Sequence, residues 1–183
     1  KIDRLEYRKF LSAQALMVIT LILHFKVVEV NHTRKEKGYE VHAVLVNTGG
    51  FSEEELKQTR ERALQLNVAS FIVLDVRETY YKEVIKYLVY GNVLKNQTYP
   101  LSVSAERILQ AKALAEHAKE INASSIAHGS TGAGNDQVRF DMIFQTIIPG
   151  VEIITPIRDL KLSREEEIAY LKNHGVAMNF EKA

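Results

Sequence analysis

Short apolar runs alternate with helical segments along most of this chain, and that alternation constrains the fold most strongly. We predict strands over residues 41–46, 71–75, 125–127 and 151–154. Strands separated by helices pair in parallel, with helices covering both faces of the sheet. The sequence therefore predicts an α/β fold with a doubly wound parallel sheet, which binds ligands at the carboxyl edge of its strands. Four loops would share that edge, namely those after Val46, Val76, His128 and Thr155.

Helix start signals support the same pattern. Ser52 and Glu55 form a capping box, in which the hydroxyl accepts from a free amide and the glutamate reaches back to another. Ser163 and Glu166 repeat it, and Gly175 is placed to end that second helix. We also predict helices over residues 77–90 and 104–121 and from about residue 136, with a loop over residues 92–103.

Composition excludes several kinds of site. The chain has 183 residues, a net charge of +1 and no cysteine. A balanced charge favours neither nucleic acid nor a membrane surface as a partner. Without cysteine there is no disulfide, thiolate metal site or thiol nucleophile. The six histidines show no metal-binding spacing, so we predict no metal held by the protein.

One apolar run, residues 15–25, needs a check against membrane insertion. It is well short of the roughly 20 residues that a spanning helix requires. No small-residue cleavage site follows it, as a signal peptide would show. We interpret it as a buried strand or helix segment of a cytoplasmic protein, although residues 1–35 as a whole fit the strand and helix pattern less well.

The richest chemistry lies in the glycine-rich loop, residues 128–135, which leads into a helix. Its glycines permit close backbone approach and positive φ, and a helix N-terminus attracts anions. Thr131 and Asn135 add neutral donors, and Asp136 can either cap the helix or hold an ammonium group. Arg139 opposes the helix dipole in the first turn. It either clamps a ligand there or forms an i, i+3 ion pair with Asp136 on a solvated face.

A second polar segment covers residues 99–104. Tyr99 and Ser104 are hydroxyl donors on either side of a turn. They are either ligand contacts or a core tyrosine and a helix-capping serine. His128 could orient the glycine-rich loop that follows it, but a structural role is the alternative. No catalytic residue can be assigned from spacing.

Taken together, these two segments resemble argininosuccinate synthase. Residues 128–140, HGSTGAGNDQVRF, match the family's signature loop at nearly every position, and residues 99–104, YPLSVS, match its citrulline loop. The similarity extends from about residue 36 to residue 179. It implies an adenine-nucleotide alpha-hydrolase-like (HUP, Rossmann-like) sheet, and an ATP-dependent carbon–nitrogen ligase of arginine biosynthesis. That enzyme joins citrulline and aspartate through citrullyl-adenylate.

The resemblance also implies roles for individual residues. The ATP contacts would be Val46, Gly129, Gly132 and Gly134. The aspartate contacts would be Thr131, Asn135 and Asp136. The citrulline contacts would be Tyr99, Ser104, Asn135 and Arg139. Mg²⁺ would accompany ATP, and the assembled enzyme would be a homotetramer.

Two departures from the family affect the expected activity. The family's first strand leads into a Ser-Gly-Gly-Leu-Asp-Thr-Ser loop that cradles pyrophosphate, and residues 1–35 contain no such loop. Ala133 stands where the family commonly has lysine. We predict an atypical segment over residues 1–35 and a nucleotide-binding domain over residues 36–183. A further C-terminal domain would supply more citrulline contacts. We expect this chain by itself to be inactive.

Two other functions remain open at this point. The chain could be a binding module that grips an amino acid or nucleotide without chemistry. It could also be another ATP-pyrophosphatase relative, such as an amidotransferase or a tRNA-modifying ligase. The residues that resemble the aspartate and citrulline loops argue against the latter, because they correspond to a different set of substrates.

Overall fold

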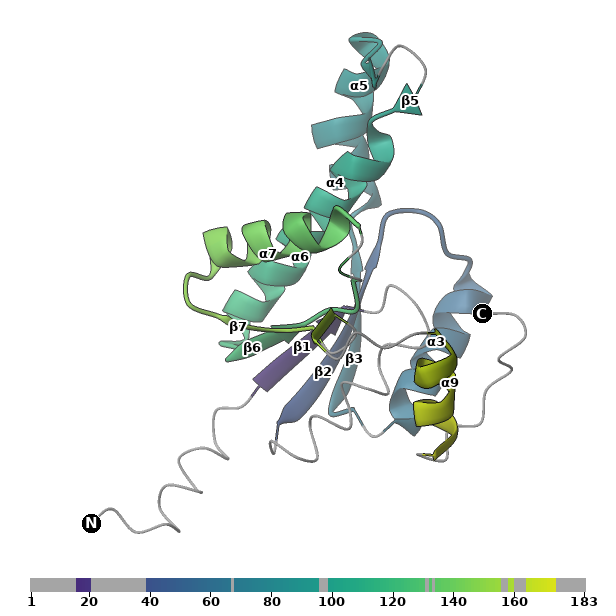
Figure 1. Ribbon diagram of the computed structural model, residues 1–183. Coiled ribbons are helices and arrows are strands. Elements are labelled where there is room, and N and C mark those ends of the chain that lie inside the picture. The colour runs from purple at the N-terminus through teal and green to yellow at the C-terminus, as the bar shows by residue number, and fades with distance from the viewer. Residues whose placement is uncertain are drawn as a thin grey trace.

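A parallel sheet forms the centre of the computed structural model (Figure 1). The structure describes residues 16–20, 39–66, 68–95, 99–130, 132, 134–155, 158–159 and 164–173. Within these residues the sheet has five strands in the order β3-β2-β1-β6-β7, and every pairing is parallel. The strands are β1 Leu16–Thr20, β2 Glu40–Asn47, β3 Ser70–Asp75, β6 Ser125–Ala127 and β7 Glu152–Ile154. The predicted α/β class and all four predicted strands are confirmed.

The N-terminal apolar run contributes the central strand. β1 lies between β2 and β6, with Met17 in register with both Val41 and Ser125. The run is therefore a strand rather than a helix, and residues within the first 35 do join the sheet. From β1 the chain builds outward to β2 and β3, then crosses to β6 and β7. The strand order thus reverses beside β1, and such switch points are where open α/β sheets form ligand crevices.

Helices cover the two faces of this sheet. The helices α6 Ser102–Glu120 and α7 Asp136–Ile147 lie over one face, while α3 Glu53–Gln65 and α9 Arg164–Asn173 lie on the other side (Figure 1). The capping box that opens α3 is confirmed, because the Glu55 amide donates to Ser52 Oγ and the Ser52 amide donates to Glu55 Oε2. Ser163 and Gly175, expected at the two ends of the last helix, lie outside the described residues.

Two apolar clusters hold the layers together. Val41 and Leu45 of β2 pack with Ala63 and Phe71 on the α3 side. Alternate residues of β2 point the other way, so Val44 and Val46 pack against the side chains of α6 and α7. Successive strand residues face opposite sides of a sheet, which explains the division. The largest side chains of the second cluster, all completely buried, are Leu114, Ile126, Phe140 and Phe144.

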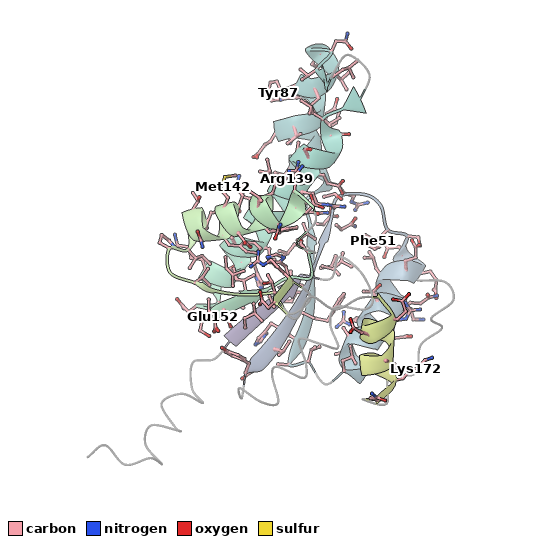
Figure 2. The ribbon with its side chains drawn as sticks, viewed as in Figure 1. Phe51, Tyr87, Arg139, Met142, Glu152 and Lys172 are labelled. Atoms are coloured by element: carbon pink, nitrogen blue, oxygen red, sulfur yellow. The ribbon has the colours of Figure 1, made fainter. Side chains whose placement is uncertain are left out.

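The segment between β3 and α6 differs from its prediction. The helix expected over residues 77–90 is present, but it consists of α4 Arg77–Tyr80, a π-helical turn Tyr81–Ile85 and α5 Lys86–Tyr90. It projects away from the sheet (Figure 1), and Tyr87 on it is well exposed (Figure 2). The loop expected over residues 92–103 contains a short antiparallel pair, β4 Leu94–Lys95 with β5 Tyr99–Pro100.

The helix that follows also begins earlier than predicted. α6 starts at Ser102, and its N-cap position is Leu101, with no side-chain cap. Ser104 is therefore not a helix cap, and its hydroxyl is used elsewhere. In the described part of the chain, no helix is both long and apolar enough to cross a membrane.

Candidate functional site

The candidate site lies at the carboxyl edge of the sheet, where the N-terminal ends of α6 and α7 meet. α6 and α7 make many contacts with each other, and Arg139 lies in the first turns of α7 (Figure 2). Each helix brings one of the two segments that the sequence singled out. The 99–104 segment leads into α6, and the glycine-rich loop leads into α7. The topology thus places two polar segments, far apart in sequence, next to each other.

Arg139 connects the two segments directly. Its Nη1 donates to Asp136 Oδ1 at 2.8 Å, and its Nη2 donates to Ser104 Oγ at 3.1 Å. The i, i+3 ion pair with Asp136 is therefore real, but the side chain is only 25% exposed and also reaches another helix. The ion pair expected on the structural alternative is thus present, although on a partly buried face rather than a fully solvated one. Three residues that the sequence singled out, Ser104, Asp136 and Arg139, therefore lie together.

Arg107 joins this cluster, although the sequence did not single it out. Its Nε lies 3.5 Å from Asp136 Oδ2, and its Nη1 donates to Gln110 Oε1 at 2.8 Å. Two arginines from two helices therefore flank one carboxylate. A signal was present in the sequence: Arg107 follows Ser104 by one helical turn, and residues three apart share a helix face.

The loop after β2 is tied to the same place. Thr48 Oγ1 donates to Glu106 Oε1 at 2.6 Å, which links the end of β2 to α6. The buried Asn47 side chain accepts from the amide of Gly49, whose φ of +115° favours glycine. Val46 lies just before this turn and is 5% exposed. The predicted nucleotide contact is therefore a core residue at the edge of the candidate site.

Tyr80 supports the start of α6 from the projecting helix. Its hydroxyl donates to the backbone oxygen of Ser102 at 2.9 Å. Burial, and then the negative charge of Glu106, raise the pKa of Tyr80 above its usual value. The phenol therefore stays protonated at neutral pH and keeps its role as a donor.

The glycine-rich loop is only partly described. Gly129 and Ser130 are buried, whereas Gly132, Gly134 and Asn135 are exposed. Gly132 and Gly134 do not use their freedom to adopt positive φ, because neither falls in the left-handed region. Asn135 occupies the N-cap position of α7 without a side-chain cap. Thr131, Ala133 and the Tyr99 side chain lie outside the described residues, so their predicted contacts stay predictions.

Concavity alone would not have found this cluster. Two open hollows occur near the carboxyl end of β3, one lined by Asp75, Arg77 and Glu78 and the other reaching across to α6. Neither is lined by Ser104 or Arg139. The candidate site is instead defined by polar side chains from two helices, whose chemistry can recognise a ligand. Among the described residues, no group of three acidic or histidine side chains is arranged to hold a metal ion.

Comparison with known proteins decides the family. The family model described as "Arginosuccinate synthase N-terminal HUP domain" matches residues 26–177. The chain belongs to the argininosuccinate synthase family. The HUP domain is the adenine-nucleotide alpha-hydrolase fold, so the more specific fold assignment is confirmed as well. The match begins after β1 and covers both polar segments of the site.

Individual family members agree with this assignment. The argininosuccinate synthase of Bacillus licheniformis is 38% identical over 142 residues, which cover 78% of this chain and 35% of that protein. The Methanococcus maripaludis enzyme is 42% identical over 138 residues, covering 75% of this chain and 34% of its own length. The Methanocaldococcus jannaschii argininosuccinate synthase is 41% identical over 139 residues, which cover 76% of this chain and 35% of that protein. The chain therefore spans about a third of the length of the curated relatives it matches.

Proposed function

We propose that this chain carries the ATP-, aspartate- and citrulline-binding part of an argininosuccinate synthase. The observation that carries the proposal is the guanidinium of Arg139, which bonds to Asp136 and to Ser104 at the same time. A cation beside a carboxylate and a hydroxyl is suited to an amino acid. The carboxylate of the amino acid can pair with the guanidinium, and its ammonium group can pair with the side-chain carboxylate. The second candidate is a module with the same ligands but no chemistry.

Each subsite has a physical rationale. Arg139 and Ser104, with Tyr99 and Asn135, would hold citrulline through donors suited to its carboxylate and ureido groups. Asp136, with Thr131 and Asn135, would hold aspartate, since a carboxylate accepts from an ammonium group. In the structure Arg139 and Asp136 bond to each other. Substrates would replace that internal pair with intermolecular ones.

ATP would lie at the carboxyl edge beside the glycine-rich loop. Gly129, Gly132 and Gly134 would let the backbone approach it, and Val46 would form an apolar wall. Mg²⁺ would accompany the phosphates as part of the substrate. The helix α7 begins at this loop, and the free amides of a helix N-terminus favour negative charge.

The proposed reaction has two displacements. The ureido oxygen of citrulline bonds to the α-phosphorus of ATP while the bond to pyrophosphate breaks. The aspartate amine then attacks the ureido carbon of citrullyl-adenylate, loses a proton and displaces AMP. Binding the two amino acids on adjacent helices would orient nucleophile and electrophile, and orientation alone can lower a barrier by several kcal/mol.

The proposal extends to the domain organisation, localisation and assembly of the protein. Residues 36–183, together with β1 as the central strand of their sheet, would form the nucleotide-binding domain of a longer cytoplasmic enzyme, which would assemble as a homotetramer. The cluster at the N-terminal ends of α6 and α7 would be the amino-acid-binding part of that enzyme. The pyrophosphate grip would fall in the loop after β1, where the family's Ser-Gly-Gly-Leu-Asp-Thr-Ser motif is not found.

Aspartate and citrulline binding tests the proposal. Calorimetric titration should show that the chain binds both aspartate and citrulline. Aspartate binding should weaken in Asp136→Asn, and citrulline binding should weaken in Ser104→Ala. Arg62→Ala is the control, since Arg62 is exposed on α3, on the other side of the sheet. Failure of both amino acids to bind, with or without ATP present, would contradict the assignment. Any citrulline-dependent release of pyrophosphate from ATP, however slow, would favour the synthase over the non-catalytic module.

A further inference from the structure

The imidazole of His128 lies completely buried directly beneath the glycine-rich loop. Its backbone amide donates to Ile154 of β7 at 3.1 Å, which fixes the residue at the end of β6. Its ring stacks on Phe140, with centroids 5.3 Å apart, and meets the edge of Phe144. Apolar packing alone would leave both ring nitrogens without partners, but each of them has a polar partner among the described residues.

Those partners define the tautomer of the ring. Ser130 donates its backbone N–H to Nδ1 at 3.3 Å, so Nδ1 is an acceptor and carries no proton. Nε2 lies 2.9 Å from Asp141 Oδ1 and therefore carries the proton and donates it to the carboxylate. A carboxylate behind an imidazole commonly holds the ring in one tautomer and one orientation.

The network continues from Asp141 back to the loop. Arg158 donates from Nη1 to Asp141 Oδ2 at 2.6 Å and to Gln137 Oε1 at 3.4 Å. Gln137 Nε2 in turn donates to the backbone oxygen of Gly132 at 2.7 Å. One chain of hydrogen bonds thus holds the loop at two backbone atoms, the Ser130 nitrogen and the Gly132 oxygen.

We propose that His128 is a positioning residue, which sets the conformation of the glycine-rich loop for ligand binding by accepting from the Ser130 amide. This rests on the proposed function, in which the loop contacts ATP and aspartate. A loop prepared in this way loses less conformational entropy when its ligand binds. Asp141 and Arg158 act through His128 and Gln137 and need not touch the ligand.

Two substitutions separate this role from simple core packing. In His128→Asn the amide oxygen falls at the position of Nδ1, and it can still accept from Ser130. In His128→Gln the amide nitrogen falls at the position of Nε2, so it keeps the bond to Asp141 but leaves the Ser130 amide without its acceptor. Both variants lose the aromatic contacts with Phe140, so a packing role predicts similar losses for the two.

Two measurements on the chain test the proposal. We expect the Ser130 amide to exchange with solvent at least about tenfold faster in His128→Gln than in His128→Asn, the scale of one lost hydrogen bond. We expect aspartate binding to weaken about tenfold in His128→Gln and less than about threefold in His128→Asn. Equal exchange rates and equal affinities in the two variants would overturn the proposal.

The outcomes also distinguish this inference from the proposed function. If the wild-type chain does not bind aspartate, the proposed function fails, while amide exchange still reports on Ser130. If either variant does not fold, ¹⁵N chemical shifts of the wild-type imidazole give the answer. A pyridine-like Nδ1 with a protonated Nε2 agrees with the proposal, and a protonated Nδ1 would overturn it.

Discussion

Replacing Arg139 with alanine is the most informative single perturbation of the candidate site. The substitution removes donors to Asp136 and Ser104 together with the proposed contact to citrulline. A hydrogen bond to a charged group contributes about 1.5–3 kcal/mol. The net loss of citrulline affinity is smaller than this, because wild-type Arg139 must give up its bonds to Asp136 and Ser104 when it binds citrulline.

Asp136 also keeps a cation in the variant. Arg107 Nε lies 3.5 Å from its other oxygen, so the carboxylate is not stranded when Arg139 is removed. We therefore expect the lower part of that range, about 1.5–2 kcal/mol, which corresponds to a loss of citrulline affinity of roughly 10- to 30-fold at 25 °C. Aspartate affinity should change less, because its proposed partner remains.

Calorimetric titration of citrulline into wild type, Arg139→Ala and Arg139→Lys measures this. Lysine keeps the charge but not the planar fork that reaches two partners at once, so it should restore only part of the affinity. Arg62→Ala on α3 controls for the loss of a surface charge. Citrulline affinity within twofold of wild type in Arg139→Ala would refute the reasoning.

Three further predictions concern stability and turnover. Phe144→Ala should lower the free energy of unfolding by about 3–5 kcal/mol in urea titrations, because Phe144 is completely buried. Val138 is exposed on the same helix, so Val138→Ala should change the free energy of unfolding little. Similar losses of stability in the two variants would contradict the assigned core. Hydrogen bonds from the Ser52 backbone and then its side chain lower the pKa of Glu55. The capping contribution is thus present above the ordinary glutamate pKa, about 4.3, and disappears as pH falls through the lowered folded value. Ser52→Ala should therefore lower the urea midpoint more at pH 7 than at pH 3, and an equal effect at both would be against it. Finally, with no pyrophosphate loop among residues 1–35, the chain should release pyrophosphate from ATP orders of magnitude more slowly than the Bacillus licheniformis relative. Release within about tenfold of that enzyme would show that the loop is dispensable.

The sequence predicted the fold well because its signals are local. Apolar runs of strand length and the Ser52 capping box depend on neighbouring residues, and they placed the main strands and α3 correctly. The π-helical turn at Tyr81–Ile85 and the β4–β5 pair were not predicted. Both lie in the projecting segment, which bonds to the start of α6 through Tyr80, and no local pattern in the sequence indicated them.

The candidate site was predictable only in part. Residue types at a glycine-rich helix start pointed to Asp136 and Arg139. Ser104 was a candidate ligand contact or helix cap, and the family resemblance favoured the ligand contact. Arg107 was missed, since a lone arginine on an alanine-rich helix looks like an ordinary solvated charge. Asp141 and Arg158 carry no signal at all in the sequence, because they lie in different elements and meet only through their side chains.

The sequence by itself therefore determined the class of fold, the family and the residue types of the site, since each follows from local patterning or a contiguous motif. Only the tertiary structure decided that the N-terminal apolar run is the central strand, and that Arg139 bridges Ser104 and Asp136. It also decided that His128 accepts from the loop while Asp141 holds its other nitrogen. These are pairings between distant segments. They follow from the register of parallel strands and the packing of α6 on α7, and a hydrogen bond requires both partners to be placed within a few tenths of an ångström.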